Sequence, residues 1–223
     1  MKLVHRNINK VINLNSEEKI NVLIVEHQSL LRELIEDLHN QINKEKGDFI
    51  LSVDDKPTEI HKYMEIYLDV FALQINKRTL INKLYKSLDV ISQNEDLILK
   101  TKELYSYIGE YIHGLINETD FELEFLLEYE ISRVLKGVDL KFTDSNKSLI
   151  EKLIDYMELI YALEGEKCFV FVNLRDFILD NEINEFYKTV LYNKFKILLI
   201  NAKDYSNSVY EERIIIDEDL CEF

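Results

Sequence analysis

The sequence predicts an α/β protein in which a head domain is built from both ends of the chain and a helical arm is inserted between them. Short apolar runs of strand length occur at residues 21–25, which are rich in β-branched residues, and at residues 168–172, which are apolar throughout. Between them, apolar residues recur at helical spacing over roughly ninety residues. We therefore predict a head over residues 1–73 and 165–223 and an arm over residues 74–164.

The first part of the head is predicted to contain several strands and one helix. The run from Asn21 to Val25 has the composition of a buried strand, and the apolar residues that follow, as far as Leu38, recur at helical spacing. Apolar or alternating residues at 49–51 and 64–68 predict further strands. Pro57, between these two segments, marks a turn or a sheet edge.

Four helices are predicted for the arm. The first two cover residues 76–91 and 94–115, where apolar residues recur on one face. A third runs from Thr119 to Gly137 and a fourth from Ser148 to Gly165. In each of these two, the first residue is followed three positions later by a glutamate, which is the pattern of a capping box, and the glycine marks the end.

The strand pattern returns after the arm. Residues 168–172 are apolar throughout, which predicts a strand covered on both faces of a sheet. A helix capped by Asp180 and a strand over residues 197–200 follow, with a last strand over residues 213–216. The C-terminal part of the head is therefore predicted to be a βαβ unit with one more strand.

The composition limits the classes of partner. Acidic residues outnumber basic residues by 42 to 27, and the net charge of -15 repels phosphate unless basic residues cluster or a cation neutralises carboxylates. No apolar run approaches the roughly 18 residues that cross a bilayer, and the first residues do not form a signal peptide. Cys168 and Cys221 are too few for a disulfide framework. We expect a soluble, cytoplasmic protein with no membrane partner.

The motifs predict no catalytic site. Neither of the glycine-rich patterns that bind phosphate, G-x-x-x-x-G-K-S/T and G-x-G-x-x-G, is present, and the turn after the first buried strand places Glu26 where a phosphate would lie. The five histidines lack ligand spacing, and no serine lies in a G-x-S-x-G turn. We assign no catalytic residue and do not expect an enzyme.

Acidic residues cluster at the start of the predicted third helix. Glu118 with Glu122 and Asp120 with Glu124 are i,i+4 pairs, and such like charges destabilise a helix by about 0.2–0.5 kcal/mol. Together with Glu128, they offer the hard oxygen ligands that suit calcium. Alternatively, the cluster only caps the helix and complements its positive end, and the spacing alone favours this interpretation because no D-x-D-x-D-G loop is present.

Basic residues are concentrated in the arm: Lys77, Arg78, Lys83, Lys86, Lys100, Lys102, Arg133, Lys136, Lys141, Lys147 and Lys152. Most residues of this kind form the solvated face of amphipathic helices. Arg133 and Lys136 differ from the others because they lie three positions apart, directly before Gly137. They make a compact positive edge at a helix end, which is suited to binding phosphates.

Two parts of the sequence resemble the type II-A CRISPR-associated adaptation protein family. Residues 168–173, the helix after Asp180 and residues 196–200 are similar to the C-terminal part of that family's head. The pattern Glu118-x-Asp120-x-Glu122-x-Glu124, followed by the segment from Arg133 to Val138, resembles the family's acidic hinge and its basic helix-to-turn segment. The order of elements matches over essentially the whole chain.

The resemblance implies a non-catalytic, homotetrameric ring that binds the ends of linear double-stranded DNA during spacer acquisition. Its head would be a nucleotide-binding-like fold without a phosphate loop, and its partners the adaptation integrase and the RNA-guided effector nuclease. Calcium would bind at Glu118, Asp120, Glu122, Glu124 and Glu128. The residues expected to contact DNA are Arg133, Lys136 and Lys141, although Asp139 lies among them.

Two other functions are compatible with the sequence. One is a nucleotide hydrolase or kinase with an atypical phosphate site in the head. The other is a scaffold whose helical arm makes only protein contacts, because amphipathic helices commonly pack on partner helices.

Overall fold

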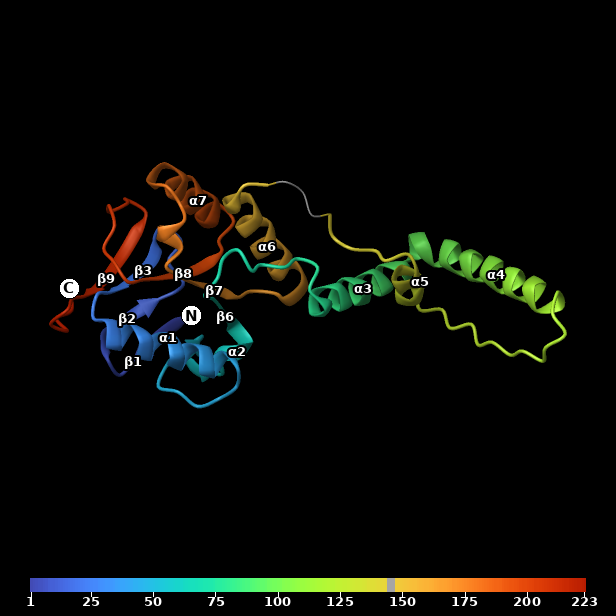
Figure 1. Cartoon of the computed structure of the whole chain (residues 1–223), viewed down its shortest axis with the longest axis horizontal. Helices are drawn as coiled ribbons and strands as arrows, with labels where there is room; N and C mark the ends of the chain where they lie inside the picture. Colours follow the sequence, from blue (N-terminus) through green and yellow to red (C-terminus); the bar gives the residue numbers. More distant parts are fainter. Residues whose placement is uncertain (144–146) are drawn as a thin grey trace. The chain divides into compact units, whose positions relative to one another are not determined.

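The computed structural model describes residues 1–143 and 147–223 and divides the chain into two compact units (Figure 1). The head unit comprises Met1–Leu73 and Asn146–Phe223, and the arm unit comprises Gln74–Ser145. The sequence boundary at residue 164 assigned α6 (Leu149–Glu164) to the arm, whereas the structure groups this helix with the head unit. The reason is its apolar face: Tyr156 packs edge-on against Tyr67 of the head sheet, with 5.6 Å between ring centroids.

A five-stranded parallel sheet forms the centre of the head unit, in the order β6-β7-β8-β3-β9. Its strands are β3 (Ile20–Val25), β6 (Met64–Tyr67), β7 (Cys168–Val172), β8 (Lys196–Asn201) and β9 (Glu211–Ile216). All residues of β3 and β7 are buried, as their apolar runs predict. β3 pairs with β8 on one side and β9 on the other, so both ends of the chain contribute to one sheet. The predicted α/β fold is confirmed.

A second, antiparallel sheet has the order β2-β1-β4-β5. Its strands are β1 (Lys2–His5), β2 (Ile8–Asn13), β4 (Ile50–Val53) and β5 (Lys56–Thr58). Leu3 and Leu51 of this sheet, Leu34 of α1 (Gln28–Ile42) and Leu23 of the parallel sheet belong to one hydrophobic core. The burial of these side chains is what holds the two sheets and α1 together.

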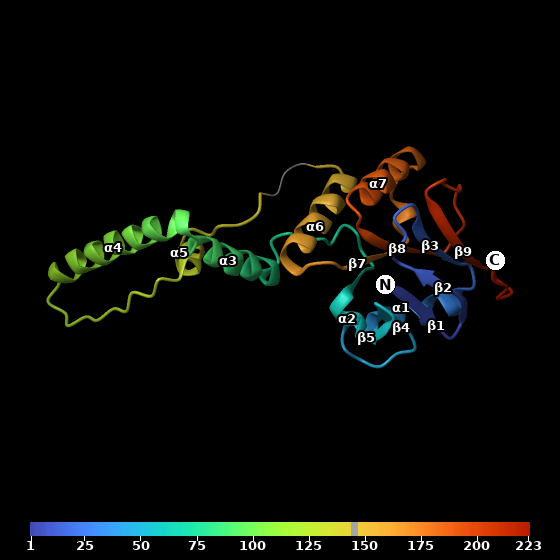
Figure 2. The ribbon, with the colours of Figure 1, turned by 180° about the vertical axis from the view of Figure 1, so that it is seen from behind.

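Helices cover both faces of the parallel sheet. Figures 1 and 2 show α6 and α7 (Asp180–Tyr192) on one face, and α1 with the antiparallel sheet on the other. The short helix α2 (Ile60–Tyr63) precedes β6, and the 3-10 helix η1 (Leu174–Asp176) follows β7. Within the described part of the chain, no helix combines the length and the apolar character needed to cross a membrane.

The arm unit contains α3 (Arg78–Ser92), α4 (Glu95–Asn117) and α5 (Ile131–Gly137). The predicted third helix is wrong over its first part, because residues 118–130 form neither helix nor strand. Thr119 donates its hydroxyl hydrogen bond backwards to the carbonyl of Ile116, 3.0 Å away, and so closes α4. In contrast, the predicted capping box at Ser148 forms, with the Glu151 carboxylate accepting from the Ser148 backbone N–H at 2.8 Å.

Candidate nucleic-acid interface

The short helix α5 is docked on α3 by hydrogen bonds to two side chains of α3. The hydroxyl of Tyr85, whose side chain is buried, donates to the carbonyl of Leu140 at 2.7 Å and lies 3.5 Å from the carbonyl of Leu135. One turn further along α3, the carboxylate of Asp89 accepts from the backbone N–H of Ser132 at 3.2 Å. Both ends of α5 are therefore fixed to α3.

A second connection holds the segment that follows α5. The side-chain amide of Asn76 donates to the carbonyl of Phe142 at 3.0 Å and accepts from the backbone N–H of the same residue at 2.9 Å. This pair spans 66 residues of sequence. The backbone that carries Arg133, Lys136 and Lys141 is thus held at both ends by residues in or just before α3.

The three predicted DNA contacts are exposed, but they differ in their partners. Arg133 forms ion pairs with Glu128 and with Glu130, the second at 3.4 Å. Lys141 is paired with Asp139 at 3.0 Å. Lys136 has no ion pair among the described residues. Exposed pairs of this kind contribute about 0–1 kcal/mol, so a phosphate can displace the carboxylates at little cost.

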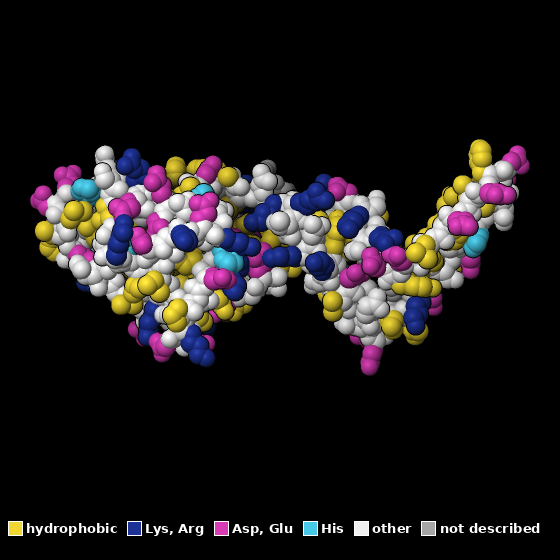
Figure 3. Space-filling model, turned by 90° about the horizontal axis from the view of Figure 1, so that it is seen from below, with side chains coloured by type: hydrophobic (Ala, Val, Ile, Leu, Met, Phe, Trp, Pro, Cys, Tyr) yellow, Lys and Arg dark blue, Asp and Glu magenta, His cyan; other side chains and the backbone are white. Residues whose placement is uncertain are grey.

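The surface made by α3 and α5 is more basic than the three predicted residues alone. Residues 74–92 and 131–143, named here the α3–α5 half of the arm unit, contain seven basic and two acidic residues, a net charge of +5. The basic residues are Lys77, Arg78, Lys83, Lys86, Arg133, Lys136 and Lys141. In Figure 3, dark blue lysine and arginine side chains gather over α3.

The residues of α3 were not among the predicted contacts, although the sequence carries a signal for them. From residue 71 to residue 88 there is no aspartate or glutamate, in a chain with 42 acidic residues. Only the docking of α5 on α3 places this acid-free stretch beside Arg133 and Lys136.

The acidic segment, residues 118–130, turns at residues 118–121 and then returns along α4 without helix or strand. The ring of Phe125 lies on His113, with 4.9 Å between centroids, and Tyr129 lies on Tyr105, with 5.0 Å between centroids. Phe125 and Tyr129 thus pack on α4, whereas Phe121 and Leu123 are exposed. From Asp120 to Phe125 the sequence alternates acidic with apolar residues, as suits an extended chain. This period of two, unlike that of a helix, explains why the predicted helix does not start at Thr119. The first four predicted calcium ligands, Glu118, Asp120, Glu122 and Glu124, are exposed.

These carboxylates do not fit a calcium ion in the arrangement described. Calcium takes six to eight oxygens at about 2.3–2.6 Å, so several carboxylates have to converge on one point. Among residues 1–143 and 147–223, no three acidic, histidine or cysteine side chains come close enough to hold a metal. Glu128, the fifth predicted ligand, is paired with Arg133 instead.

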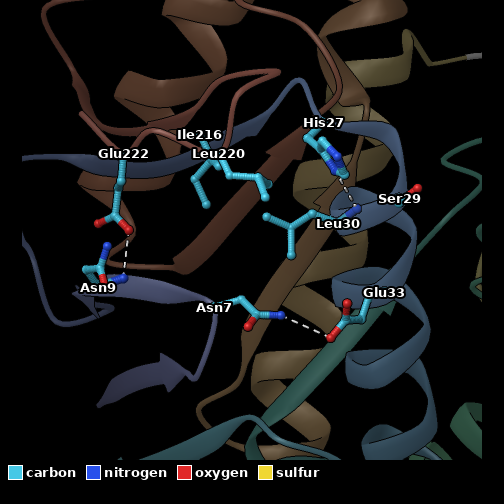
Figure 4. Close-up of a pocket in the computed structure, with 9 residues that line it drawn as sticks. All are labelled: Asn7, Asn9, His27, Ser29, Leu30, Glu33, Ile216, Leu220 and Glu222. Carbon is cyan, nitrogen blue, oxygen red and sulfur yellow. Dashed lines mark hydrogen bonds between the residues drawn. The ribbon is translucent and has the colours of Figure 1, made fainter.

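The turn between β3 and α1 lies in the head where a nucleotide-binding fold has its phosphate loop. The ring Nδ1 of His27 accepts from the backbone N–H of Leu30 at 3.2 Å and caps α1. Beside it lies a cavity of about 300 Å³ that contains the carboxylates of Glu33 and Glu222 (Figure 4). Of the described residues that line it, none is lysine or arginine. Its charge therefore disfavours a nucleotide phosphate.

The comparisons with known proteins agree with the predicted family. No curated protein matches the chain. The family model described as CRISPR-associated protein (Cas_Csn2) matches residues 41–220, which is about four fifths of the chain and includes the whole arm unit. This is a family of CRISPR adaptation proteins and not a known family of enzymes. The chain, with its α/β head and inserted helices, therefore belongs to the CRISPR-associated Csn2 family, and its function is related to CRISPR adaptation.

Proposed function

We propose that this protein binds linear double-stranded DNA by its phosphates, without catalysis, as a homotetrameric ring during spacer acquisition. The observation that carries the proposal is the basic α3–α5 half, with a net charge of +5 in a chain whose total is -15. Rigid attachment of α5 to α3 by Tyr85 and Asp89 holds these charges in one arrangement. Such a surface suits a regular array of phosphates.

The proposed contact is independent of base sequence. Duplex DNA carries one negative charge per about 1.7 Å of its axis, and lysines or arginines that neutralise phosphates release condensed counterions. Binding of this kind weakens steeply with salt and reads no bases. Arg133 and Lys141 can exchange their carboxylate partners for phosphates because exposed ion pairs are weak.

Assembly would compensate for the small number of cations on one copy. Contacts from several linked copies act on one duplex, so the overall affinity exceeds that of each copy. A closed ring would also select ends, since an intact circle cannot be threaded. In this proposal the ring works in the cytoplasm beside the adaptation integrase and the RNA-guided effector nuclease.

Calcium dependence is a separate part of the proposal and rests on the family resemblance. The acidic segment does not gather its carboxylates in the arrangement described, so a calcium ion would require this segment to rearrange. Calcium titration followed by amide hydrogen exchange of residues 118–130 tests this part. Exchange rates that calcium leaves unchanged would count against a site here.

The main proposal is tested by electrophoretic shifts with one duplex in linear and in covalently closed circular form. Binding is measured in calcium and again in chelator, from 50 to 200 mM salt, and light scattering gives the mass of the protein. We expect a tetramer that binds the linear form, with an affinity that falls linearly in log[salt]. Absence of binding to linear duplex at low salt with calcium would refute DNA binding.

One observation favours a second function, that of a protein-interaction scaffold. Large apolar side chains on α4 are exposed, with Leu99 at 68%, Tyr107 at 68% and Tyr111 at 70% exposure. Such a face suits packing against another helix. A protein that purifies as a monomer or dimer and has no affinity for duplex ends would support this function instead.

A further inference from the structure

Three exposed residues of α3 form one stripe along the helix. Arg78, Asn82 and Lys86 are each four positions apart, so they lie one above the other on the same side. From the first to the last, the stripe extends about 12 Å along the helix axis. All three side chains carry N–H donors, and none carries a negative charge.

The stripe lies next to the line of contact with α5. Tyr85 and Asp89, which hold α5, are themselves four positions apart on α3. Lys86 follows Tyr85 by one residue and precedes Asp89 by three, so it stands at the side of the docking line. The backbone of α5 therefore runs beside the stripe.

Arg78 and Lys86 differ in their ion pairing from two of the three predicted contacts, whereas Lys136 resembles them in having no ion pair among the described residues. Arg133 and Lys141 both have carboxylate partners. Within residues 1–143 and 147–223, no ion pair involves Arg78 or Lys86. The nearest acidic residue in the α3 sequence, Asp89, is engaged by the backbone N–H of Ser132. A phosphate that meets the stripe has no carboxylate to displace, whereas one that meets Arg133 displaces two.

We propose that α3 supplies the principal phosphate-binding row of the arm, with Arg78 and Lys86 as charged contacts and the Asn82 amide as a neutral donor between them. The inference rests on the proposed DNA binding and names the residues that perform most of it. Arg133 and Lys136 on α5, with Lys141 in the segment after it, then form a second row. The guanidinium of Arg78 can donate two parallel hydrogen bonds to one phosphate, and Lys86 acts as a point charge.

The test compares two double variants that remove equal charge from the two halves of the arm. R78Q/K86Q changes the stripe, and K100Q/K102Q changes two exposed lysines of α4. For R78Q/K86Q we expect the slope of log K against log[salt] to fall by about 1.8 for each protomer on the duplex. Raising the salt from 50 to 200 mM weakens the binding of each protomer. For R78Q/K86Q, this weakening should be about 12-fold smaller than for the wild-type protein. K100Q/K102Q should keep the wild-type slope.

Charge-conserving variants separate binding from folding. R78K/K86R keeps both charges and should retain the wild-type slope, while N82D places a carboxylate in the stripe and should weaken binding. Circular dichroism and light scattering confirm that each variant keeps its helix content and mass. If R78Q/K86Q keeps the wild-type slope, or if K100Q/K102Q reduces the slope equally, the proposed role of the stripe is wrong. The proposal that the protein binds DNA is not affected by either result. Failure of the wild-type protein to bind refutes the proposed function itself.

Discussion

The two halves of the arm unit have opposite charge and different construction. The α3–α5 half carries a net charge of +5, whereas residues 93–130, with α4 and the acidic segment, carry two basic and ten acidic residues, a net charge of -8. The first half is fixed by side-chain hydrogen bonds to backbone from Tyr85, Asp89 and Asn76. In the second, an extended chain lies along one helix through aromatic contacts.

This contrast teaches that the total charge of a chain says little about its partner when basic and acidic residues lie in separate parts of the molecule. Each half carries a large net charge of one sign, but the two charges largely cancel when the arm is taken as a whole. The two halves meet at Arg133, which belongs to the basic half and is paired with Glu128 and Glu130 of the acidic one. The predictions below test how far the halves act independently.

The largest effect is expected from Tyr85→Ala, which removes the support of the basic half. Deletion of a buried aromatic ring costs about 3–5 kcal/mol, and the carbonyl of Leu140 also loses its donor. Urea unfolding should show this loss, and amide exchange should accelerate in α5 before it does in α4. Tyr85→Phe is the matched control, with a loss of about 1 kcal/mol for the hydrogen bond alone. Equal stability of the two variants would contradict the docking role of the ring.

A smaller effect is expected where the halves meet. E128Q/E130Q frees the guanidinium of Arg133, and we expect duplex affinity in chelator to rise by about fivefold, since the two exposed pairs contribute up to about 1 kcal/mol. The control, E122Q/E124Q, removes the same charge from the same segment without touching a partner of Arg133. Fluorescence anisotropy with a labelled duplex measures both. If the control gains as much as the test variant, charge alone explains the result and the pairing is irrelevant.

The smallest effect concerns pH and lies in the head unit, which serves as a reference for the arm. Burial lowers the pKa of His5 from its usual value near 6.5, against the opposing influence of Asp37, Asp48 and Glu33. Its Nδ1 accepts from the backbone N–H of Asn7 at 3.2 Å, so protonation breaks this contact.

Because the folded-state pKa is the lower one, the stabilisation by neutral His5 is complete above pH 6.5 and declines as the pH falls through 6.5 towards the folded-state pKa. Thermal unfolding between pH 7.5 and 5 should show this decline, and His5→Asn should flatten it. The arm variants should leave the pH profile unchanged. A profile that survives in His5→Asn would assign the titration to another group.

The two predicted capping boxes show where local sequence suffices and where it does not. Ser148 and Glu151 form theirs because helical periodicity follows, with Leu153, Met157 and Ile160 buried on one face. Thr119 and Glu122 have the same local pattern, but the residues after them alternate acidic with apolar, which suits an extended chain on α4. The period over the next ten or so residues is therefore the better predictor of a helix.

The candidate site was predictable only in part, for a related reason. Arg133 and Lys136 could be selected because their spacing and the glycine after them are local signals. For Arg78 and Lys86, which we propose as contacts, the only local signal is the acid-free stretch around them. Their position beside α5 depends on Tyr85 reaching a carbonyl 55 residues away, and no local pattern encodes that pairing. Likewise, α6 belongs to the head because of a ring contact with Tyr67, not because of its own periodicity.

The clamp between Asn76 and Phe142 has a consequence for how the arm can change its length. It joins two points of the backbone that are 66 residues apart, so the chain between them forms one closed loop. The entropic cost of closing a flexible loop grows slowly with its length, and doubling the length costs only about 0.6 kcal/mol. Whole helical turns can therefore be gained or lost in α4, together with a matching length of the acidic segment that packs on it, without moving the two closing residues. We expect related genes to encode arms of differing reach, with the clamp itself kept.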